Sequence, residues 1–244
     1  MLKCLNKLMK IYLITSDARV NQTMETHSHF FKKYWPSADV TVLGYEPPQC
    51  DSDFIKFESL GIDMGVDFLT KQLYDYFSKI DESQFIFCVD DMPITRPIDI
   101  EFIKYTEELL KGNGVIGRVG LTSDNVRRPH ILETNITDRV NLIENNYDAM
   151  FKLSATWSAW NRDYFLLYLN DYKNLWDWEL RGSKKSVQDD FRILSYVPPP
   201  MRFSHLIKHG DINPEWYKEA YYGVEEMFYD DQQKIREIYN DEIK

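Results

Sequence analysis

Long apolar runs are missing from this chain of 244 residues. No window reaches about 18 consecutive apolar residues, the length that a membrane-spanning helix requires, so the sequence predicts no such helix. The first ten residues carry Lys3, Lys7 and Lys10 and lack the apolar segment of a secretory leader. We therefore expect neither a signal peptide nor a transmembrane segment.

Cysteine is scarce and irregularly spaced. The three cysteines are Cys4, Cys50 and Cys88, and none belongs to a Cys-x-x-Cys pair. A small, odd number argues against a disulfide framework and against structural zinc. Cys88 lies inside an apolar run, where a small core residue is expected rather than a nucleophile. These features favour a reducing compartment, and we expect a cytoplasmic protein.

Positive charge is in deficit. The sequence holds 29 Lys and Arg against 39 Asp and Glu, which gives a net charge of −10. Proteins that bind nucleic acid neutralise phosphates with a basic surface, so nucleic acid is not expected as the main partner. A small anionic ligand, held by a metal ion and a few local cations, is compatible with this balance.

What the chain does have is an alternation of strand-like and helix-like segments up to residue 121. The hydrophobic content of 43% is enough for a sizeable core. Strands are expected at 11–15, 39–45, 54–57, 85–89 and 115–121, and helices at 22–34, 68–80 and 98–111. This alternation predicts a mostly parallel sheet with helices on both faces.

The second half has short β-prone runs, many tryptophans and polar turns. Helices are expected at 163–176 and 188–196, with a helical terminal segment at 215–244 and a break at Pro198–Pro200. No internal repeat or linker divides the chain. We expect one α/β domain over 1–244, with a first half at about 10–121, a mixed second half at about 122–212 and a C-terminal segment at 213–244.

The stretch Phe85–Met92 is the most informative in the chain, because an apolar run ends abruptly in two carboxylates. Asp90 and Asp91 cannot lie inside a buried strand, since an unpaired charge in a core costs several kcal/mol. The pair must therefore mark the point where the strand leaves the sheet. In open α/β sheets this carboxyl edge is where ligands bind. Two hard oxygen ligands there suit Mg²⁺ or Mn²⁺ carrying phosphates, and a simple surface turn is the alternative.

Two tryptophan-rich segments follow. Trp157 and Trp160 alternate with small residues in the segment 154–165. Flat aromatic faces beside hydroxyls suit sugar rings, but buried tryptophans in a core turn fit the pattern equally well. Glu179 follows Trp176 and Trp178 directly. Aromatic neighbours would desolvate this carboxylate partly, which suits an acid or base, and a solvated helix end is the alternative.

Further polar residues occur later in the chain. Asp189 and Asp190 are expected in the first turn of a helix, where acidic residues also simply complement the helix dipole. His205 and His209 are each compatible with a structural role. His209, which precedes a glycine, could instead reach a metal as a neutral imidazole ligand. Lys208 could neutralise a phosphate.

Taken together, these stretches resemble a nucleotide-sugar glycosyltransferase of the GT-A fold. The segment 11–17 is similar to the nucleotide-binding first strand of that family, and FIFCVDDM resembles its apolar strand ending in a D-x-D motif. SATWSAWNRDYF resembles the small-residue, Trp-Asn-Arg segment of several bacterial and viral members. WDWELRGS is similar to the Trp-x-x-Glu element that follows. The likeness covers about residues 10–212 and implies a GT-A-like α/β fold, with the first half binding the nucleotide sugar and the second half facing the acceptor.

The resemblance implies roles for particular residues. Asp91 would bind the metal, although the first acid of a D-x-D motif is replaced by Val89, and His209 would complete the metal shell. Glu179 would act on the acceptor, with Asp189 or Asp190 as the alternative base. The donor, for which a UDP-sugar is favoured, would contact six residues: Thr15, Asp17, Arg19, Asp90, Trp157 and Lys208.

The expected reaction is metal-dependent transfer of a sugar, hexosyltransferase-like, from a nucleotide sugar to a carbohydrate or other hydroxyl acceptor. One alternative keeps the fold but transfers a nucleotidyl group to a sugar phosphate. Such enzymes have a glycine-rich loop after the first strand, and the segment 16–21 has no glycine. The other alternative is a non-catalytic carbohydrate-binding module, in which the tryptophans bind and the aspartates are turn residues.

Overall fold

The fold is seen in a computed structural model that describes residues 8–15, 20–49, 54–123, 129–137, 140–146, 148–208, 211–218 and 226–239. A single nine-stranded sheet runs through these residues, in the order β3-β2-β1-β4-β8-β5-β9-β7-β6. The strands β8 and β7 run against the others, as the pairings show. The strands are β1 (Ile11–Ile14), β2 (Val40–Gly44), β3 (Ile55–Ser59), β4 (Gln84–Val89), β5 (Ile116–Gly120), β6 (His130–Thr137), β7 (Val140–Asn145), β8 (Ser158–Asn161) and β9 (Arg192–Val197), with a separate pair β10 (Ile207–Lys208) and β11 (Asp211–Ile212).

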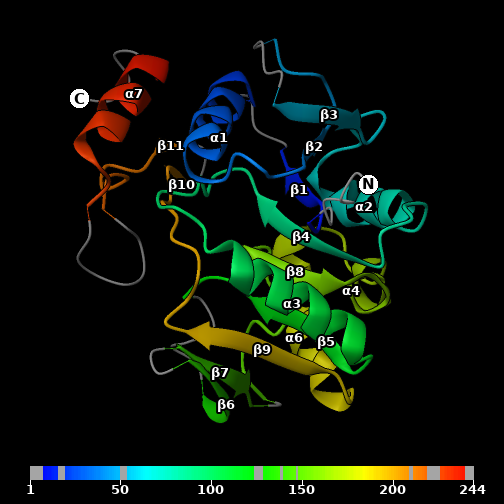
Figure 1. The fold of residues 1–244 in the computed structure, drawn as a ribbon. Helices are drawn as coiled ribbons and strands as arrows, with labels where there is room; N and C mark the ends of the chain where they lie inside the picture. The colour runs from blue at the N-terminus through cyan, green and yellow to red at the C-terminus, as the bar shows by residue number, and fades with distance from the viewer. Residues whose placement is uncertain are drawn as a thin grey trace, which may run out of the picture.

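Helices cover both faces of the sheet (Figure 1). The α-helices are α1 (Val20–Tyr34), α2 (Leu69–Phe77), α3 (Ile100–Gly112), α4 (Arg162–Leu169), α5 (Leu175–Asp177), α6 (Ser183–Lys185) and α7 (Tyr229–Ile238). Short 3-10 turns form η1 (Val66–Phe68) and η3 (Ser186–Gln188), and a π-helical turn forms η2 (Trp178–Gly182). The expected α/β class, with a mostly parallel sheet flanked by helices, is confirmed.

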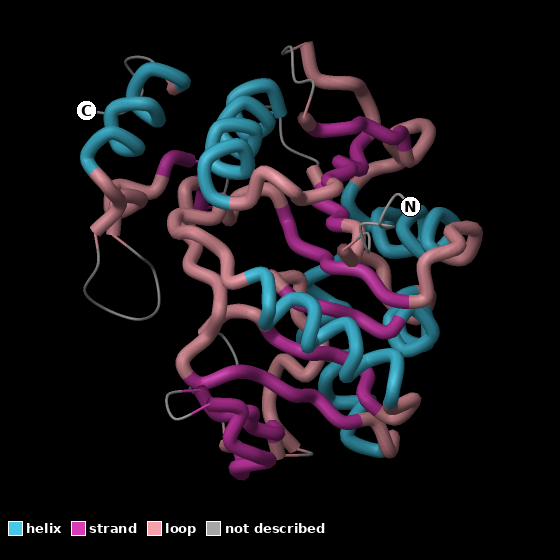
Figure 2. The backbone as a smooth tube through the Cα atoms, in the orientation of Figure 1, coloured by secondary structure: helices cyan, strands magenta, loops and turns pink. Residues whose placement is uncertain are grey.

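The alternation of side chains along each strand builds two apolar layers. In β1, Ile11 and Leu13 pack with residues of α1 and α3, whereas Tyr12 and Ile14 pack with residues of α2 and α4. Successive side chains of a strand point to opposite faces, so a strand buried on both sides reads as a continuous apolar run. Figure 2 shows the sheet running between these helices.

The C-terminal helix α7 lies beside α1 (Figure 1). Asp231, whose side chain is fully buried, accepts hydrogen bonds from His29 at 2.9 Å, Lys33 at 2.7 Å and Tyr34. Burial alone would raise the pKa of Asp231, but these three donors lower it below its ordinary value. A carboxylate stabilised in this way ties α7 to α1.

The structure corrects the expected elements of the second half. The helix expected at 163–176 ends at Leu169. The helix expected at 188–196 is wrong, because most of that segment forms the strand β9 between β5 and β7. Of the helical segment expected at 215–244, the described residues contain only α7. Within the described ranges, no helix has the length and apolar character needed to cross a membrane.

Candidate functional site

The candidate site lies where β1 and β4 end side by side. The two strands are parallel, and Ile14 is the register partner of Val89, so Thr15 and Asp90 leave the sheet together. The Asp90 amide donates to the carbonyl oxygen of Ile14 at 3.1 Å. Asp90 is 7% exposed, and Asp91 is half-buried. The predicted position of the aspartate pair, at the carboxyl edge of a buried strand, is confirmed.

Three hydrogen bonds hold the turn from Asp90 to Met92, which we call the aspartate turn. His27 Nε2 lies 2.8 Å from the Asp90 carbonyl oxygen, and because a carbonyl can only accept, the ring nitrogen is the donor. The Leu206 amide donates to the Asp91 carbonyl oxygen at 3.0 Å. Trp157 Nε1 donates to the Met92 carbonyl oxygen at 2.7 Å. Three consecutive carbonyl groups are therefore fixed by groups from three separate parts of the chain.

His27 is a residue of this site that sequence reasoning missed. Complete burial lowers the pKa of His27 to about 4, so the ring is neutral near pH 7 and carries a single N–H. The bond to Asp90 assigns that hydrogen to Nε2. A signal was present in the sequence, because His27 falls in the helical stripe of Met24 and Phe31, where an apolar side chain would be ordinary.

Cys88 lies in β4, two residues before Asp90. Burial raises the pKa of its thiol well above the ordinary range, and the charges of Asp91 and Asp90 raise it further. A thiol in these surroundings is not a nucleophile at neutral pH, which agrees with the expected core role of Cys88.

The segment that leads into β8 borders the aspartate turn. The Val89 amide donates to the Ala155 carbonyl at 3.1 Å, and the Leu121 amide donates to the Trp157 carbonyl at 3.1 Å. Trp157 and Trp160 are fully buried. Of the two alternatives for these tryptophans, the structure therefore favours the core. Trp157 meets the site through its N–H, and its ring faces offer no surface to a sugar.

Glu179 is connected to the same segment. Its Oε1 accepts a hydrogen bond from the Ala155 amide at 2.6 Å. Glu179 lies in η2, directly after the buried Trp178 and three residues after Trp176, which is 66% exposed. The carbonyl of Ala155 also accepts a hydrogen bond from the Val89 amide. Ala155 therefore links Glu179, the expected acceptor-side carboxylate, to the strand that precedes the aspartate pair.

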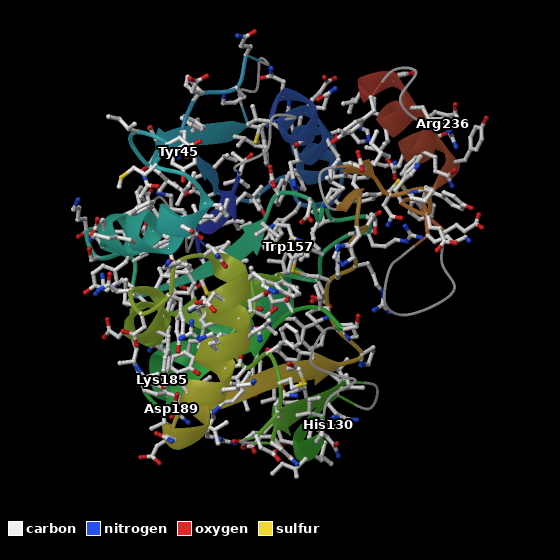
Figure 3. All side chains as sticks on the ribbon, turned by 180° about the vertical axis from the view of Figure 1, so that it is seen from behind. Tyr45, His130, Trp157, Lys185, Asp189 and Arg236 are labelled. Carbon is white, nitrogen blue, oxygen red and sulfur yellow. The ribbon has the colours of Figure 1, made fainter. Side chains whose placement is uncertain are left out.

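Asp189 and Asp190 lie elsewhere. They precede β9, which runs parallel to β5 and in the same direction as β4, so this pair stands at the amino edge of the sheet. Asp189 accepts from Tyr168 Oη at 2.6 Å and from the Phe191 amide at 2.9 Å, and it lies 3.7 Å from Lys152 Nζ. Asp190 is exposed. Figure 3 shows Asp189 well apart from Trp157, whose indole N–H donates to the Met92 carbonyl of the aspartate turn.

The late segment before Lys208 runs alongside Asp91. Phe203 pairs with Ile94 in an antiparallel bridge, and the Ser204 and Leu206 amides donate to the carbonyls of Pro93 and Asp91 at 3.0 Å each. Residues 203–206 therefore lie against the aspartate turn, and β10 begins directly after them.

Several predicted site residues cannot be placed. Asp17, Arg19 and His209, together with the side chain of Lys208, lie outside the described residues. Among the side chains that the structure does describe, no group of three or more His, Cys, Asp and Glu is placed to hold a metal ion. The expected roles of Asp17, Arg19 and Lys208 at the donor, and of His209 at the metal, remain predictions.

A cavity of about 600 Å³ lies along β3 and α2, away from the aspartate turn. It is lined by Glu58, Ser59, Leu60, Ile62, Met64, Gln72, Asp75, Tyr76, Lys79 and Ile80. Gln72 is already committed to the carbonyls of Leu60 and Ile62 and to Tyr45 Oη. The aspartate turn is the better candidate site, because a buried and a half-buried carboxylate lie there on backbone fixed by hydrogen bonds.

No family model and no curated protein matches the chain. Among solved structures, it is similar to a CMP:2-keto-3-deoxy-manno-octonic acid synthetase complexed with CTP, with 12% identity, a TM-score of 0.44, and coverage of 77% of this chain and 88% of the other. A UDP-glucose pyrophosphorylase complexed with UDP-glucose is 9% identical, with a TM-score of 0.43 and coverage of 81% and 93%. A glucosyl-3-phosphoglycerate synthase from M. tuberculosis is 12% identical, with a TM-score of 0.34 and coverage of 65% and 58%. Likeness at this level carries no argument about the reaction.

Proposed function

We propose that the protein is a metal-dependent glycosyltransferase that moves a sugar from a nucleotide sugar, with UDP as the favoured nucleotide, to an acceptor hydroxyl. The observation that carries the proposal is the aspartate turn. Asp90 and Asp91 stand at the carboxyl edge of a mostly parallel sheet, beside Thr15 at the end of β1, on backbone fixed by three hydrogen bonds. Ligands of open α/β sheets bind at this edge.

The residues present suit a divalent cation that arrives with a diphosphate. Mg²⁺ is usually held by one or two carboxylates, with phosphates and waters completing its shell, so a third protein carboxylate is not required. Asp91 would be the metal ligand, and His209 the predicted additional one. When bound, the ion supplies positive charge that stabilises the departing nucleoside diphosphate.

Glu179 is the proposed general base. The Ala155 amide orients its carboxylate at 2.6 Å, and a carboxylate held in place can accept a proton when an acceptor hydroxyl is bound next to it. As the acceptor oxygen bonds to the anomeric carbon, the bond from that carbon to the diphosphate breaks, and the hydroxyl proton moves to Glu179. The same edge of the sheet would then serve both substrates.

The burial of the tryptophans weighs against a carbohydrate-binding module. The chain has six tryptophans, and Trp176 alone exposes its ring, while the other five are buried: Trp35, Trp157, Trp160, Trp178 and Trp216. A module that binds sugars through aromatic platforms needs such rings at the surface.

The experiment that tests the proposal compares the candidate reactions directly. Thermal melting with UDP, GDP and CMP, each with and without Mn²⁺, identifies the nucleotide from the increase in melting temperature that binding produces. Purified protein is then given the matching nucleotide sugars, and release of the nucleoside diphosphate is measured. Release that requires Mn²⁺ is the expected result. Release of pyrophosphate from a nucleoside triphosphate and a sugar phosphate would instead establish nucleotidyl transfer. Absence of both reactions and of any nucleotide binding would contradict the proposal.

A further inference from the structure

Two buried rings meet behind the aspartate turn. His27 comes from α1, and Trp157 comes from the segment before β8. Both are fully buried, with ring centroids 6.5 Å apart. Each ring directs its N–H at a carbonyl oxygen of the turn, His27 at Asp90 and Trp157 at Met92. The two rings therefore bind the carbonyl groups of the residues before and after Asp91.

These contacts determine the backbone of Asp91. Each peptide unit is planar, so the conformation of a residue depends on the orientations of the two planes that flank it. The carbonyl bonded to His27 belongs to the plane before Asp91, and the carbonyl bonded to Leu206 belongs to the plane after it. Trp157 holds the following plane through Met92. The direction in which the Asp91 side chain leaves the backbone is therefore set by donors outside the turn.

Packing alone does not explain a histidine at this position. Its neighbours Phe31 and Trp157 are aromatic, and its centroid lies 6.0 Å from that of Phe31. A phenylalanine would fill the same layer without the cost of burying a polar ring. Unlike phenylalanine, histidine has a ring N–H, and this group donates a hydrogen bond to the Asp90 carbonyl at 2.8 Å.

We propose that His27, assisted by Trp157, is a positioning residue that aims the Asp91 carboxylate at the metal and diphosphate of the donor. The role rests on the proposed function, because it presupposes that Asp91 binds the ion. His27 itself touches neither substrate nor metal, and it acts through the Asp90–Asp91 peptide plane.

The test measures Mn²⁺ affinity, by electron paramagnetic resonance of the free ion in the presence of UDP, so that no turnover is needed. His27→Phe keeps a ring but loses the donor, and we expect the dissociation constant to rise about tenfold. His27→Gln, whose amide can donate, should recover part of this loss. Trp157→Phe should weaken binding in the same direction. Phe31→Leu is the matched control, because Phe31 packs against both rings yet donates no hydrogen bond, and it should lower the melting temperature while changing the affinity less than about twofold.

A second measurement examines the ring directly. In the ¹⁵N spectrum of the wild-type protein at neutral pH, the His27 ring should show a protonated Nε2 and a bare Nδ1. The opposite tautomer would overturn the proposal, and so would equal Mn²⁺ affinity in His27→Phe and wild type, or equal losses in His27→Phe and Phe31→Leu. In those cases the proposed function stands. If the wild type binds no Mn²⁺ with any of UDP, GDP or CMP, the proposed function fails and the positioning role fails with it. Should His27→Phe not fold, His27→Gln and Trp157→Phe decide the question.

Discussion

Asp90-Asp91 follows the carboxyl end of β4, whereas Asp189-Asp190 stands just before the amino end of β9. As sequence the two dipeptides are identical, and each is followed by an apolar residue, Met92 and Phe191. In the fold they occupy opposite edges of one sheet, because β4 and β9 run in the same direction. The first pair has its backbone fixed by donors from three segments, while Asp189 is fixed through its side chain by Tyr168 and the Phe191 amide. The position of an aspartate pair relative to its strand therefore determines its surroundings more than the two residues themselves do.

The largest effect is expected at Glu179, which is linked to the first pair through Ala155. Glu179→Gln should lower turnover on the order of a hundredfold or more, with donor affinity nearly unchanged, because the amide oxygen can still accept from the Ala155 N–H. Asp189→Asn should cost stability but keep turnover. Steady-state kinetics with separate donor and acceptor titrations measure both. Loss of turnover in Asp189→Asn, with a fully active Glu179→Gln, would reverse the comparison.

The next effect concerns the aspartates themselves. Asp91→Ala should weaken Mn²⁺-dependent nucleotide binding on the order of a hundredfold, because it removes a partly buried charge from the proposed metal site. Asp190→Ala should leave that binding unchanged, since Asp190 is exposed at the other edge of the sheet. Isothermal titration with UDP and Mn²⁺ distinguishes the two variants. Similar affinities in Asp91→Ala and wild type would show that the first pair is only a turn.

Acid should lower the stability of the fold through His27, which bonds to the backbone of the first pair. The pKa of His27 is lowered to about 4 in the folded protein, whereas it is about 6.5 in an unfolded chain. Between these values the unfolded state binds more protons, so stability is fully present above pH 6.5 and falls as the pH drops towards 4, by about 3 kcal/mol at most.

Urea unfolding at several pH values between 7 and 4.5 measures this dependence. His27→Gln should flatten the curve, because the buried imidazole is gone. A curve of the same steepness in the variant would show that other groups cause the loss of stability in acid.

The smallest effect is expected from Tyr168→Phe. This change removes one hydrogen bond to Asp189 and should lower the free energy of unfolding by about 1 kcal/mol. Nucleotide affinity should not change, because the contact lies at the amino edge. A change in affinity that exceeds the change in stability would mean that the second pair communicates with the donor site.

The first half of the fold could be predicted because most of its strands are buried on both faces, β3 being the exception. Runs such as 11–14 and 85–89 are apolar throughout, and neither needs knowledge of its neighbours to be identified as a strand. From the second run it followed that Asp90 and Asp91 lie at the carboxyl edge. The general position of the site was thus available from local sequence.

The second half was harder because long-range pairing overrides local preference there. Arg192–Val197 has the spacing of a helix but forms β9, since β5 and β7 pair with it on either side. β8 has only four residues, and its ends, Ser158 and Asn161, are polar, so the sequence alone does not predict a strand there. The contacts of His27 with Asp90 and of Leu206 with Asp91 join segments far apart in the chain, and no local pattern contains them.

β8 joins two strands of the sheet that are synthesised earlier, β4 and β5. It lies between β4 and β5 and bonds to both, although the ribosome completes those two strands well before Ser158 emerges. Until then the edge of β4 is open, and β5 has neither of its neighbours, β8 and β9. Unpaired apolar edges recruit strands from other chains, and pairing across a long loop forms slowly. A chain cut after residue 121 is therefore expected to aggregate rather than to fold as a smaller unit. The nascent protein needs protection until β8, the central strand of the sheet, has been synthesised.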